Sequence, residues 1–191
     1  MSFSAKKISE SNQQLIQKVR DGNKDAFEKL FYGYYHDLCS LAFKITRCSQ
    51  QARDVVQNVF LKLWKKRRTW HITTSIKAYL YQAVWNEALN FEADKKRERF
   101  LKKEFAKTPG FHTESENPIL GANTRRLIAE IWKIVDTLPQ RRKFVFILHR
   151  KHGLTYAEIA KVMQISPKTV ENHMGLALEE IRDKIDYRYL S

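Results

Sequence analysis

The sequence predicts an all-α protein made of two small helical domains that are joined by a flexible linker. Apolar residues recur with the helical period along most of the chain, and no window shows strand-like alternation bounded by hairpin turns. Residues 107–123 instead hold Pro109-Gly110 and Asn117-Pro118 with no apolar period, which is typical of a linker. We therefore expect domains over residues 1–105 and 124–191, with a linker over 106–123.

The first domain is expected to hold a helical block from about residue 9 to residue 104. The block is interrupted at residues 21–23, at 47–49 and in the polar stretch 67–74. Within it, residues 51–66 place apolar side chains on two separate stripes of one helix. The wider stripe consists of Val55, Val56, Val59, Phe60 and Leu63, and the second stripe consists of Asp54, Gln57, Leu61 and Trp64.

The second stripe of this helix has two interpretations. Aliphatic and aromatic side chains ringed by polar groups are typical of the centres of protein-binding surfaces. The same pattern fits a central helix that is buried on all sides. The stripe therefore predicts either a partner-binding face or a fully enclosed helix.

The helix expected over residues 75–99 carries aromatic side chains on two faces. Its core face would hold Ile76, Tyr79, Leu80, Ala83, Val84 and Phe91, whereas Tyr81, Gln82 and Trp85 would project from the other face. The basic and amide side chains of this helix are Lys77, Asn86, Asn90, Lys95, Lys96, Arg97 and Arg99. Aromatic rings in a positive groove stack on unpaired bases, with about 1–3 kcal/mol per base. The alternative places Tyr81 and Trp85 in an interhelical core and the charges on a solvated face.

The second domain is expected to contain a helix-turn-helix over residues 154–181. Upstream of it, Leu138-Pro139 separates two helices, and Gly153 ends the helix over 140–152. The inward face of the first helix of the motif consists of Ile159, Ala160 and Met163, and Gln164-Ile165 forms the turn. Ser166 is the expected N-cap of the second helix and Pro167 its first residue. The residues expected to bury this second helix are Val170, Met174, Ala177, Leu178 and Ile181.

The exposed N-terminal end of that second helix is the predicted DNA-reading surface. Lys168 and Asn172 would face outward, with Thr169, Glu171 and His173 at the edge of the surface. Asn and Lys side chains in this place pair with adenine and guanine edges in the major groove. The alternative is a helical hairpin with a polar outer face. If φ of Gln164 is positive, the turn costs about 1–2 kcal/mol, because a non-glycine residue is strained in that conformation.

The charge of the chain favours a polyanionic partner. Its 35 Lys and Arg residues against 21 Asp and Glu residues give a formal net charge of +14. Neutralising phosphates with such side chains releases condensed counterions, which makes binding to nucleic acid strong and salt-sensitive. A basic surface that is merely solvated explains the same excess.

The sequence offers little for a metal, a cofactor or an enzymatic reaction. Cys39 and Cys48 do not form a CxxC pair, and His149 and His152 lie three apart on one helix without a third ligand. No carboxylate cluster or nucleophile with a base stands out, so we expect no catalytic site and no cofactor. The first residues lack the apolar core of a signal peptide, and no run approaches the roughly 20 apolar residues of a membrane span. We therefore expect a cytoplasmic protein.

In their order along the chain and around a linker, these patterns resemble the sigma-70 family of bacterial RNA polymerase initiation factors in its short extracytoplasmic-function (ECF) form. Residues 21–30 look like the opening of the family's region 2, and residues 53–64 resemble its polymerase-binding helix. Residues 75–99 match its promoter-opening segment, and the helix-turn-helix resembles its region 4. Residues 166–173 are also similar to a variant common among iron-uptake-type sigma factors of the Bacteroidetes. The resemblance covers nearly the whole chain.

The resemblance implies which partners the chain meets and through which residues. Core RNA polymerase would be bound at its β′ clamp and β flap, promoter DNA at its −10 and −35 elements, and an anti-sigma factor, often membrane-anchored, would control the chain. No small-molecule substrate is implied, and the active protein would be associated with the nucleoid. The residues implied to bind the clamp are Asp54, Gln57, Leu61 and Trp64. Those implied at the −10 element are Trp70, His71, Thr73, Lys77, Tyr81, Gln82, Trp85, Asn86, Asn90, Lys95, Lys96 and Arg97, and the loop 70–74 among them would capture a flipped base. Those implied at the −35 element are Arg141, Arg142, Tyr156, Ser166, Lys168, Thr169, Glu171, Asn172 and His173.

Another function that fits part of the sequence is that of a free-standing transcription regulator. Such a protein would bind duplex DNA through a helix-turn-helix without delivering polymerase. It accounts for residues 154–181 but not for the patterns over residues 51–99. Loss of polymerase binding on substitution of Leu61 and Trp64 by alanine would separate the two functions.

Overall fold

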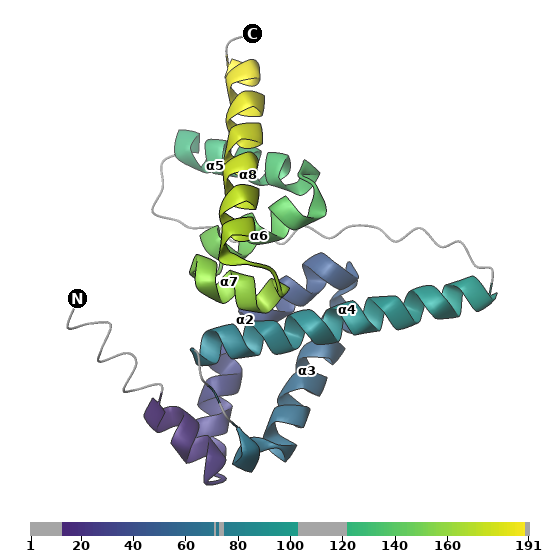
Figure 1. Ribbon diagram of the computed structural model, residues 1–191, viewed down its shortest axis with the longest axis vertical. Helices are drawn as coiled ribbons and strands as arrows, with labels where there is room; N and C mark the ends of the chain where they lie inside the picture. Colours follow the sequence, from purple (N-terminus) through teal and green to yellow (C-terminus); the bar gives the residue numbers. More distant parts are fainter. Residues whose placement is uncertain (1–12, 71, 73–74, 103–121, 190–191) are drawn as a thin grey trace. The chain divides into compact units, whose positions relative to one another are not determined.

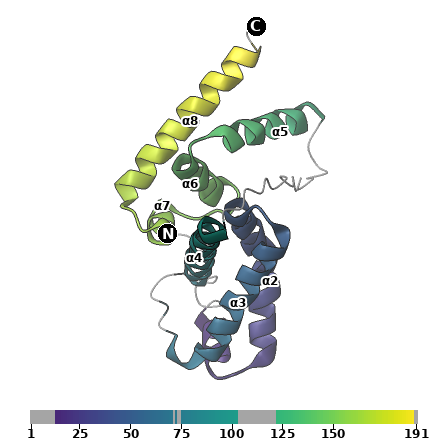
Figure 2. The same cartoon turned by 90° about the vertical axis from the view of Figure 1, so that its right-hand side faces the viewer.

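The computed structural model describes residues 13–70, 72, 75–102 and 122–189, and within these ranges every regular element is a helix. The all-α prediction is therefore confirmed. The chain divides into two compact units, Met1–Phe111 and His112–Ser191. The helices of the first unit are residues 13–20, α2 (Lys24–Thr46), α3 (Ser49–Lys65), the short 3-10 helix η1 (Arg67–Thr69) and α4 (Ile76–Lys102). Those of the second unit are α5 (Ala122–Thr137), α6 (Gln140–Arg150), α7 (Tyr156–Met163) and α8 (Pro167–Tyr189), as labelled in Figures 1 and 2.

The two ends of α2 are set by local chemistry at residues 22–23 and 47. Gly22 has a φ of +89°, a conformation that favours glycine, and the Asn23 side chain then accepts a hydrogen bond of 2.8 Å from the Ala26 amide. At the other end, Arg47 has a left-handed backbone with φ 54°, and its amide donates to the Phe43 carbonyl at 2.8 Å. The interruptions predicted at residues 21–23 and 47–49 are confirmed.

The core of the first unit lies where α2, α3 and α4 pack on one another (Figure 2). From α3, the predicted apolar stripe is buried in full and consists of Val55, Val56, Val59, Phe60 and Leu63. From α2, Leu30, Leu38 and Leu41 are buried against it. Because α3 keeps its second stripe outside this core, the interpretation of α3 as a fully enclosed helix is wrong.

In α4, the expectation that Tyr81 and Trp85 project from the helix is wrong. The relative accessibility of Tyr81 is 0% and that of Trp85 is 7%. Since α4 packs against both α2 and α3, it buries a wide arc of its surface, which includes these two aromatic side chains. Burial, with the negative charge of Asp37 nearby, raises the pKa of the Tyr81 hydroxyl above its ordinary value. The two rings therefore form part of the interhelical core, which was the alternative.

In the second unit, α8 packs against α5, α6 and α7 (Figure 1). Pro139 precedes the first residue of α6 as predicted, and α6 ends at Arg150, before Gly153 with φ 62°. The centre of this unit consists of the apolar run from Phe144 to Leu148, together with Ile134, Leu154 and Ile159 from neighbouring segments. Among the described residues, no helix combines the length and the apolar character needed to cross a membrane.

The helix-turn-helix has the predicted turn. Thr155 caps α7 through a reciprocal pair of hydrogen bonds with Glu158, and Gln164 adopts the left-handed conformation with φ 55°. The Ser166 hydroxyl accepts a hydrogen bond of 3.0 Å from the Thr169 amide, as expected of an N-cap, and Pro167 opens α8. Val162 is fully buried in α7 although the sequence did not single it out.

One residue of the predicted α8 core lies elsewhere. Val170, Met174, Ala177 and Ile181 are buried as expected, but Leu178 is 37% exposed. Spacings of four, three and four residues keep the buried set on one face, and Leu178 lies one position beyond Ala177, which turns it about 100° around the helix. The assignment of Leu178 to the core is therefore wrong.

Candidate functional site

The first candidate surface is an apolar groove between α2 and α3. Gln57, Leu61 and Trp64 line it from α3, so three of the four residues of the second stripe come together. The groove has a volume of about 450 Å³. Its other lining residues are Lys24, Phe27, Glu28 and Phe31 from α2 and Phe60 from α3.

Aromatic packing holds this groove in shape. The Phe27 ring centroid lies 4.8 Å from that of Trp64 and 5.9 Å from that of Phe60, and Phe31 lies 4.9 Å from Phe60. The Arg67 guanidinium lies over the Trp64 ring, 4.3 Å from its centroid, and donates a hydrogen bond of 2.9 Å to the Trp64 carbonyl. Leu61 remains 51% exposed beside these fixed rings. An exposed leucine next to a rigid aromatic wall is the chemistry of a protein-binding surface.

Asp54, the fourth residue of the predicted set, does not line the groove. It lies about one turn before Gln57, and its carboxylate accepts a hydrogen bond of 3.0 Å from the Gln50 side chain. Sequence reasoning instead missed Phe27 and Phe31 on α2. Their spacing of four residues, which places both on one helix face, was the signal for them.

The second candidate surface is built from the segment after α3 and from α4. Trp70 was expected in a base-capturing loop, but its accessibility is only 3%. Its indole Nε1 donates a hydrogen bond of 3.0 Å to the Leu63 carbonyl, and its ring centroid lies 6.2 Å from that of Tyr79. Trp70 therefore anchors the segment that leads into the loop and is not available to receive a base in this structure. His71 and Thr73 lie outside the described residues.

The polar side chains of α4 divide into two groups. Gln82, Asn86, Asn90 and Arg97 lie on one stripe of the helix, because their spacings of four, four and seven residues return to the same face. Asn90 and Arg97 are exposed on this stripe, and Gln82 and Asn86 are partly exposed. Lys77 and Lys95 lie on the side of the helix nearer the core, where Lys95 donates to the Gln51 side chain at 3.0 Å. Lys96 is exposed beside the stripe.

The third candidate surface is the N-terminal end of α8. Lys168 and Asn172 are exposed there, as expected of base-reading side chains. Lys168 forms an ion pair of 2.9 Å with Glu171, which also faces solvent. Thr169 and His173 are half-buried at the edge, and the Thr169 hydroxyl hydrogen-bonds that of Ser166 at 2.8 Å.

Tyr156, His149 and His152 pack within the second unit. The Tyr156 ring lies 5.1 Å from that of His149 in an edge-to-face arrangement, and the Nδ1 atom of His149 is 2.9 Å from the Leu154 carbonyl. His152 is buried. In the described part of the chain, no cluster of three metal-ligating side chains occurs.

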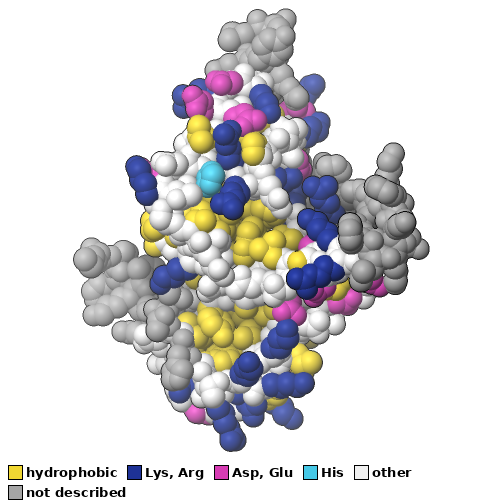
Figure 3. All heavy atoms as spheres, turned by 45° about the vertical axis from the view of Figure 1, so that its right-hand side comes forward, with side chains coloured by type: hydrophobic (Ala, Val, Ile, Leu, Met, Phe, Trp, Pro, Cys, Tyr) yellow, Lys and Arg dark blue, Asp and Glu magenta, His cyan; other side chains and the backbone are white. Residues whose placement is uncertain are grey.

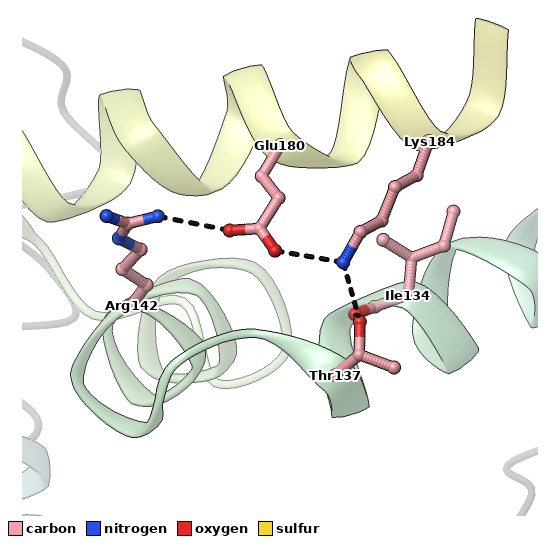
Figure 4. Close-up of polar contacts among 5 residues, drawn as sticks. All are labelled: Ile134, Thr137, Arg142, Glu180 and Lys184. Atoms are coloured by element: carbon pink, nitrogen blue, oxygen red, sulfur yellow. Dashed lines mark hydrogen bonds and ion pairs between the residues drawn. The ribbon is translucent and has the colours of Figure 1, made fainter. Parts of the chain in front are cut away.

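Arg141 and Arg142, which the sequence treats alike, have different surroundings. Arg141 is exposed, whereas Arg142 donates to the Glu180 carboxylate on α8 at 3.1 Å. Figure 4 shows that Glu180 also accepts from Lys184 at 2.9 Å, and that Lys184 donates to the Thr137 hydroxyl at 3.0 Å. The hydrogen bond from Lys184, assisted by Arg142, lowers the pKa of the Glu180 carboxyl below its ordinary value. Arg142 thus links α6 to α8 and is less free than Arg141 to contact a phosphate.

The surface of the chain carries Lys and Arg side chains in each unit. On the face drawn in Figure 3, basic side chains border exposed hydrophobic side chains. The exposed amides at the −10 and −35 candidate surfaces belong to Asn90 and Asn172, and exposed cations there include Lys96, Arg97 and Arg141, which suit contacts with bases and phosphates. The Arg97 guanidinium also lies 3.8 Å from the Asp94 carboxylate.

Comparison with known proteins identifies the family to which the chain belongs. The model of sigma-70 region 2 matches residues 30–98, and that of sigma-70 region 4 matches residues 128–181. The RNA polymerase sigma-H factor of Pseudomonas aeruginosa is 26% identical over an alignment of 178 residues, with 90% of this chain and 92% of that protein covered. The ECF RNA polymerase sigma-E factor of Escherichia coli is 25% identical over 181 residues, with 92% of this chain and 94% of that protein covered.

A solved structure supports the fold. The sigma factor RpoE from Bartonella quintana, in complex with the anti-sigma factor NepR, superposes with a TM-score of 0.63 at 17% identity, over 84% of this chain and 96% of that chain. The two matched regions span more than half of the chain and contain α3, α6, α7 and most of α4. With region 2 before region 4 and ECF factors among its relatives, the chain belongs to the ECF group of the sigma-70 family of RNA polymerase sigma factors.

Proposed function

We propose that this ECF sigma factor holds core RNA polymerase through the groove between α2 and α3. The observation that carries this proposal is the position of Leu61, which is 51% exposed beside the wall formed by Trp64 and Phe27. A helix of the polymerase β′ clamp that inserts an apolar side chain here would bury Leu61 without deforming the wall. Asp54 and Gln57 would form hydrogen bonds at the rim.

Binding of core polymerase by the Leu61→Ala variant tests this proposal. We expect the variant to fold normally, because Leu61 lies outside the core, and to bind core polymerase about 30-fold more weakly, as loss of a hot-spot side chain does. The measurement is fluorescence anisotropy of the labelled chain titrated with core polymerase. The matched control is Leu89→Ala, which removes another exposed leucine of the same unit, 39% exposed on α4. Equal binding by both variants would exclude the groove.

We propose that the −10 element is contacted by α4 and by the loop that follows Trp70. The stripe of Gln82, Asn86, Asn90 and Arg97 offers amide groups for base edges and one cation for a phosphate. His71 and Thr73 would capture the unpaired base, with Trp70 holding the start of the loop. Extrusion of a base costs a few kcal/mol, which a pocket and nearby cations offset. Opening of the DNA in this way needs no nucleotide hydrolysis.

We propose that α8 reads the −35 element as duplex DNA. Lys168 and Asn172 would contact base edges in the major groove, while Arg141 contacts the backbone. Ser166, Thr169 and Tyr156 would support the approach of α8 to the groove. Separate surfaces for polymerase, the −10 element and the −35 element would let one chain hold all three partners at once.

We further infer that an anti-sigma factor controls this chain and that it acts in the cytoplasm, at the nucleoid when bound to promoters. The support is that RpoE of Bartonella quintana, which shares the fold, was solved in complex with the anti-sigma factor NepR. Co-purification of a tagged chain from its own cells, before and after induction of its genes, tests this inference. A partner that leaves on induction is the expected result, and a chain bound to core polymerase under both conditions would contradict it.

A further inference from the structure

A polar pocket lies at the turn that precedes α2. It has a volume of about 350 Å³ and is lined by Gln17, Arg20, Asp21 and Arg68. Its two arginines come from distant parts of the sequence, since Arg20 ends the helix over residues 13–20 and Arg68 belongs to η1. The fold of the first unit thus brings two guanidinium groups to one small cavity.

A third arginine lies at the same turn. A Cβ atom on Gly22 would meet the Arg67 Nε atom at 3.7 Å and the Nη2 atom at 3.8 Å, so the Arg67 guanidinium lies over this glycine. Its Nη1 atom donates to the Trp64 carbonyl, whereas its Nε atom is buried without a hydrogen-bond partner. The turn therefore gathers three guanidinium groups, of which one has an unsatisfied buried donor.

The single acidic side chain in the pocket, Asp21, offsets only part of the charge of the three guanidinium groups. The Asp21 carboxylate accepts a hydrogen bond of 2.9 Å from the Gln17 amide. In the part of the chain that the structure describes, neither Arg20 nor Arg68 forms an ion pair, whereas Lys62, Lys143 and Lys184 all pair with carboxylates. Guanidinium forks match the geometry of phosphate oxygens, and their donors here are unused.

We propose that this pocket binds one backbone phosphate of the unpaired promoter strand, next to the base that the loop captures. Arg68 lies two residues before Trp70, which anchors the start of that loop through its bond to Leu63. Arg20 and Arg68 make the direct contacts with the phosphate, and Arg67 adds charge behind them. This inference rests on the proposed function, because it assigns a phosphate to the strand whose base is read at the −10 element.

Binding of single-stranded promoter DNA to the holoenzyme tests the pocket. The probe is a fluorescent oligonucleotide that carries the −10 element of a mapped start site, and a scrambled oligonucleotide serves as reference. We expect Arg20→Gln and Arg68→Gln each to lower affinity about threefold to tenfold and to flatten the slope of log affinity against log salt by about 0.7, as for one lost phosphate on a single strand. The preference for the −10 oligonucleotide over the scrambled one is unchanged in both variants. Arg126→Gln, which removes an exposed arginine of α5, binds like the wild type.

Neutral methylphosphonate links, placed one at a time in the oligonucleotide, locate the phosphate. We expect one position to weaken binding by the wild type and to have no further effect on Arg68→Gln. Variants that bind DNA like the wild type, while inorganic phosphate still protects the pocket of the wild type from arginine-modifying reagents, would assign the pocket to a small anion and overturn the inference. A wild-type holoenzyme that does not distinguish the −10 from the scrambled oligonucleotide would instead refute the proposed function.

Discussion

At the scale of single residues, Trp70 shows how one side chain connects a helix end to a functional loop. The last carbonyls of α3 have no partner inside the helix, and the Trp70 indole satisfies that of Leu63 at 3.0 Å. The same ring is buried near Tyr79 of α4. Trp70 therefore ties α3 to α4 and sets the point from which the loop begins.

Two substitutions of Trp70 should therefore lower the stability of the first unit by different amounts. We expect Trp70→Phe to cost about 1–3 kcal/mol, because the Leu63 carbonyl is left buried without its donor. Trp70→Ala should cost about 3–5 kcal/mol, because it also leaves a cavity. The free energy of unfolding in urea, followed by circular dichroism, measures both losses. Tyr32→Ala, which removes an aromatic side chain that is 70% exposed on the same unit, is the control, and equal stability of all three variants would contradict this role.

At the scale of elements, α8 serves two purposes along its length. Its N-terminal end presents Lys168 and Asn172, while its middle is joined to α6 and α5 through Glu180 and Lys184. Both partners of Glu180 are cations on the same side of α8, as Figure 4 shows. These contacts therefore help to fix the orientation of α8 relative to α5 and α6.

The stabilisation by Glu180 should depend on pH. Lys184 and Arg142 hold the pKa of this carboxyl below its ordinary value of 4.5, so its contribution is complete above about pH 4.5 and is lost as pH falls through the folded-state value. We expect Glu180→Gln to lower the midpoint of urea unfolding at pH 7 and to differ little from the wild type at pH 3. The control is Glu179→Gln, an exposed neighbour on α8. If the urea midpoints of Glu180→Gln and the wild type differed equally at pH 7 and pH 3, the charge on Glu180 would not be the cause of the stabilisation.

Substitutions at the N-terminal end of α8 and at Arg141 should distinguish contacts with bases from contacts with the DNA backbone. We expect Lys168→Ala and Asn172→Ala each to cost about 1–3 kcal/mol at particular −35 positions, while other positions keep their preference. Arg141→Ala should weaken binding to every sequence alike and reduce the salt dependence. A panel of duplexes with single base changes, measured at several salt concentrations, checks both. If Lys168→Ala and Asn172→Ala lowered affinity equally for every duplex, neither side chain would read a base.

At the scale of the whole molecule, the sequence predicts the order of the helices well. Caps and breakers are local, so the turn at Gly22 and the caps at Asn23 and Thr155 lie where residue chemistry favours them. Arg47 and Gln164 instead adopt a left-handed conformation that is strained for residues other than glycine. The helical pattern left open whether Tyr81 and Trp85 are buried, because their burial depends on α4 packing against two helices rather than one. Residue patterns cannot show that contact. The same holds for Phe27 and Phe31, whose role in the groove becomes visible only when α2 lies beside α3.

We infer that this one chain carries core RNA polymerase to promoters and opens them. The most direct measurement incubates core polymerase with the purified chain on genomic DNA of its own organism and maps the 5′ ends of the RNA, with core polymerase alone as reference. We predict new transcripts that begin at defined positions and share a pair of motifs centred near −35 and −10, and we predict that Leu61→Ala strongly lowers their yield when the chain is limiting. Binding of the chain to duplex DNA without any new start sites would contradict the account and identify a free-standing regulator.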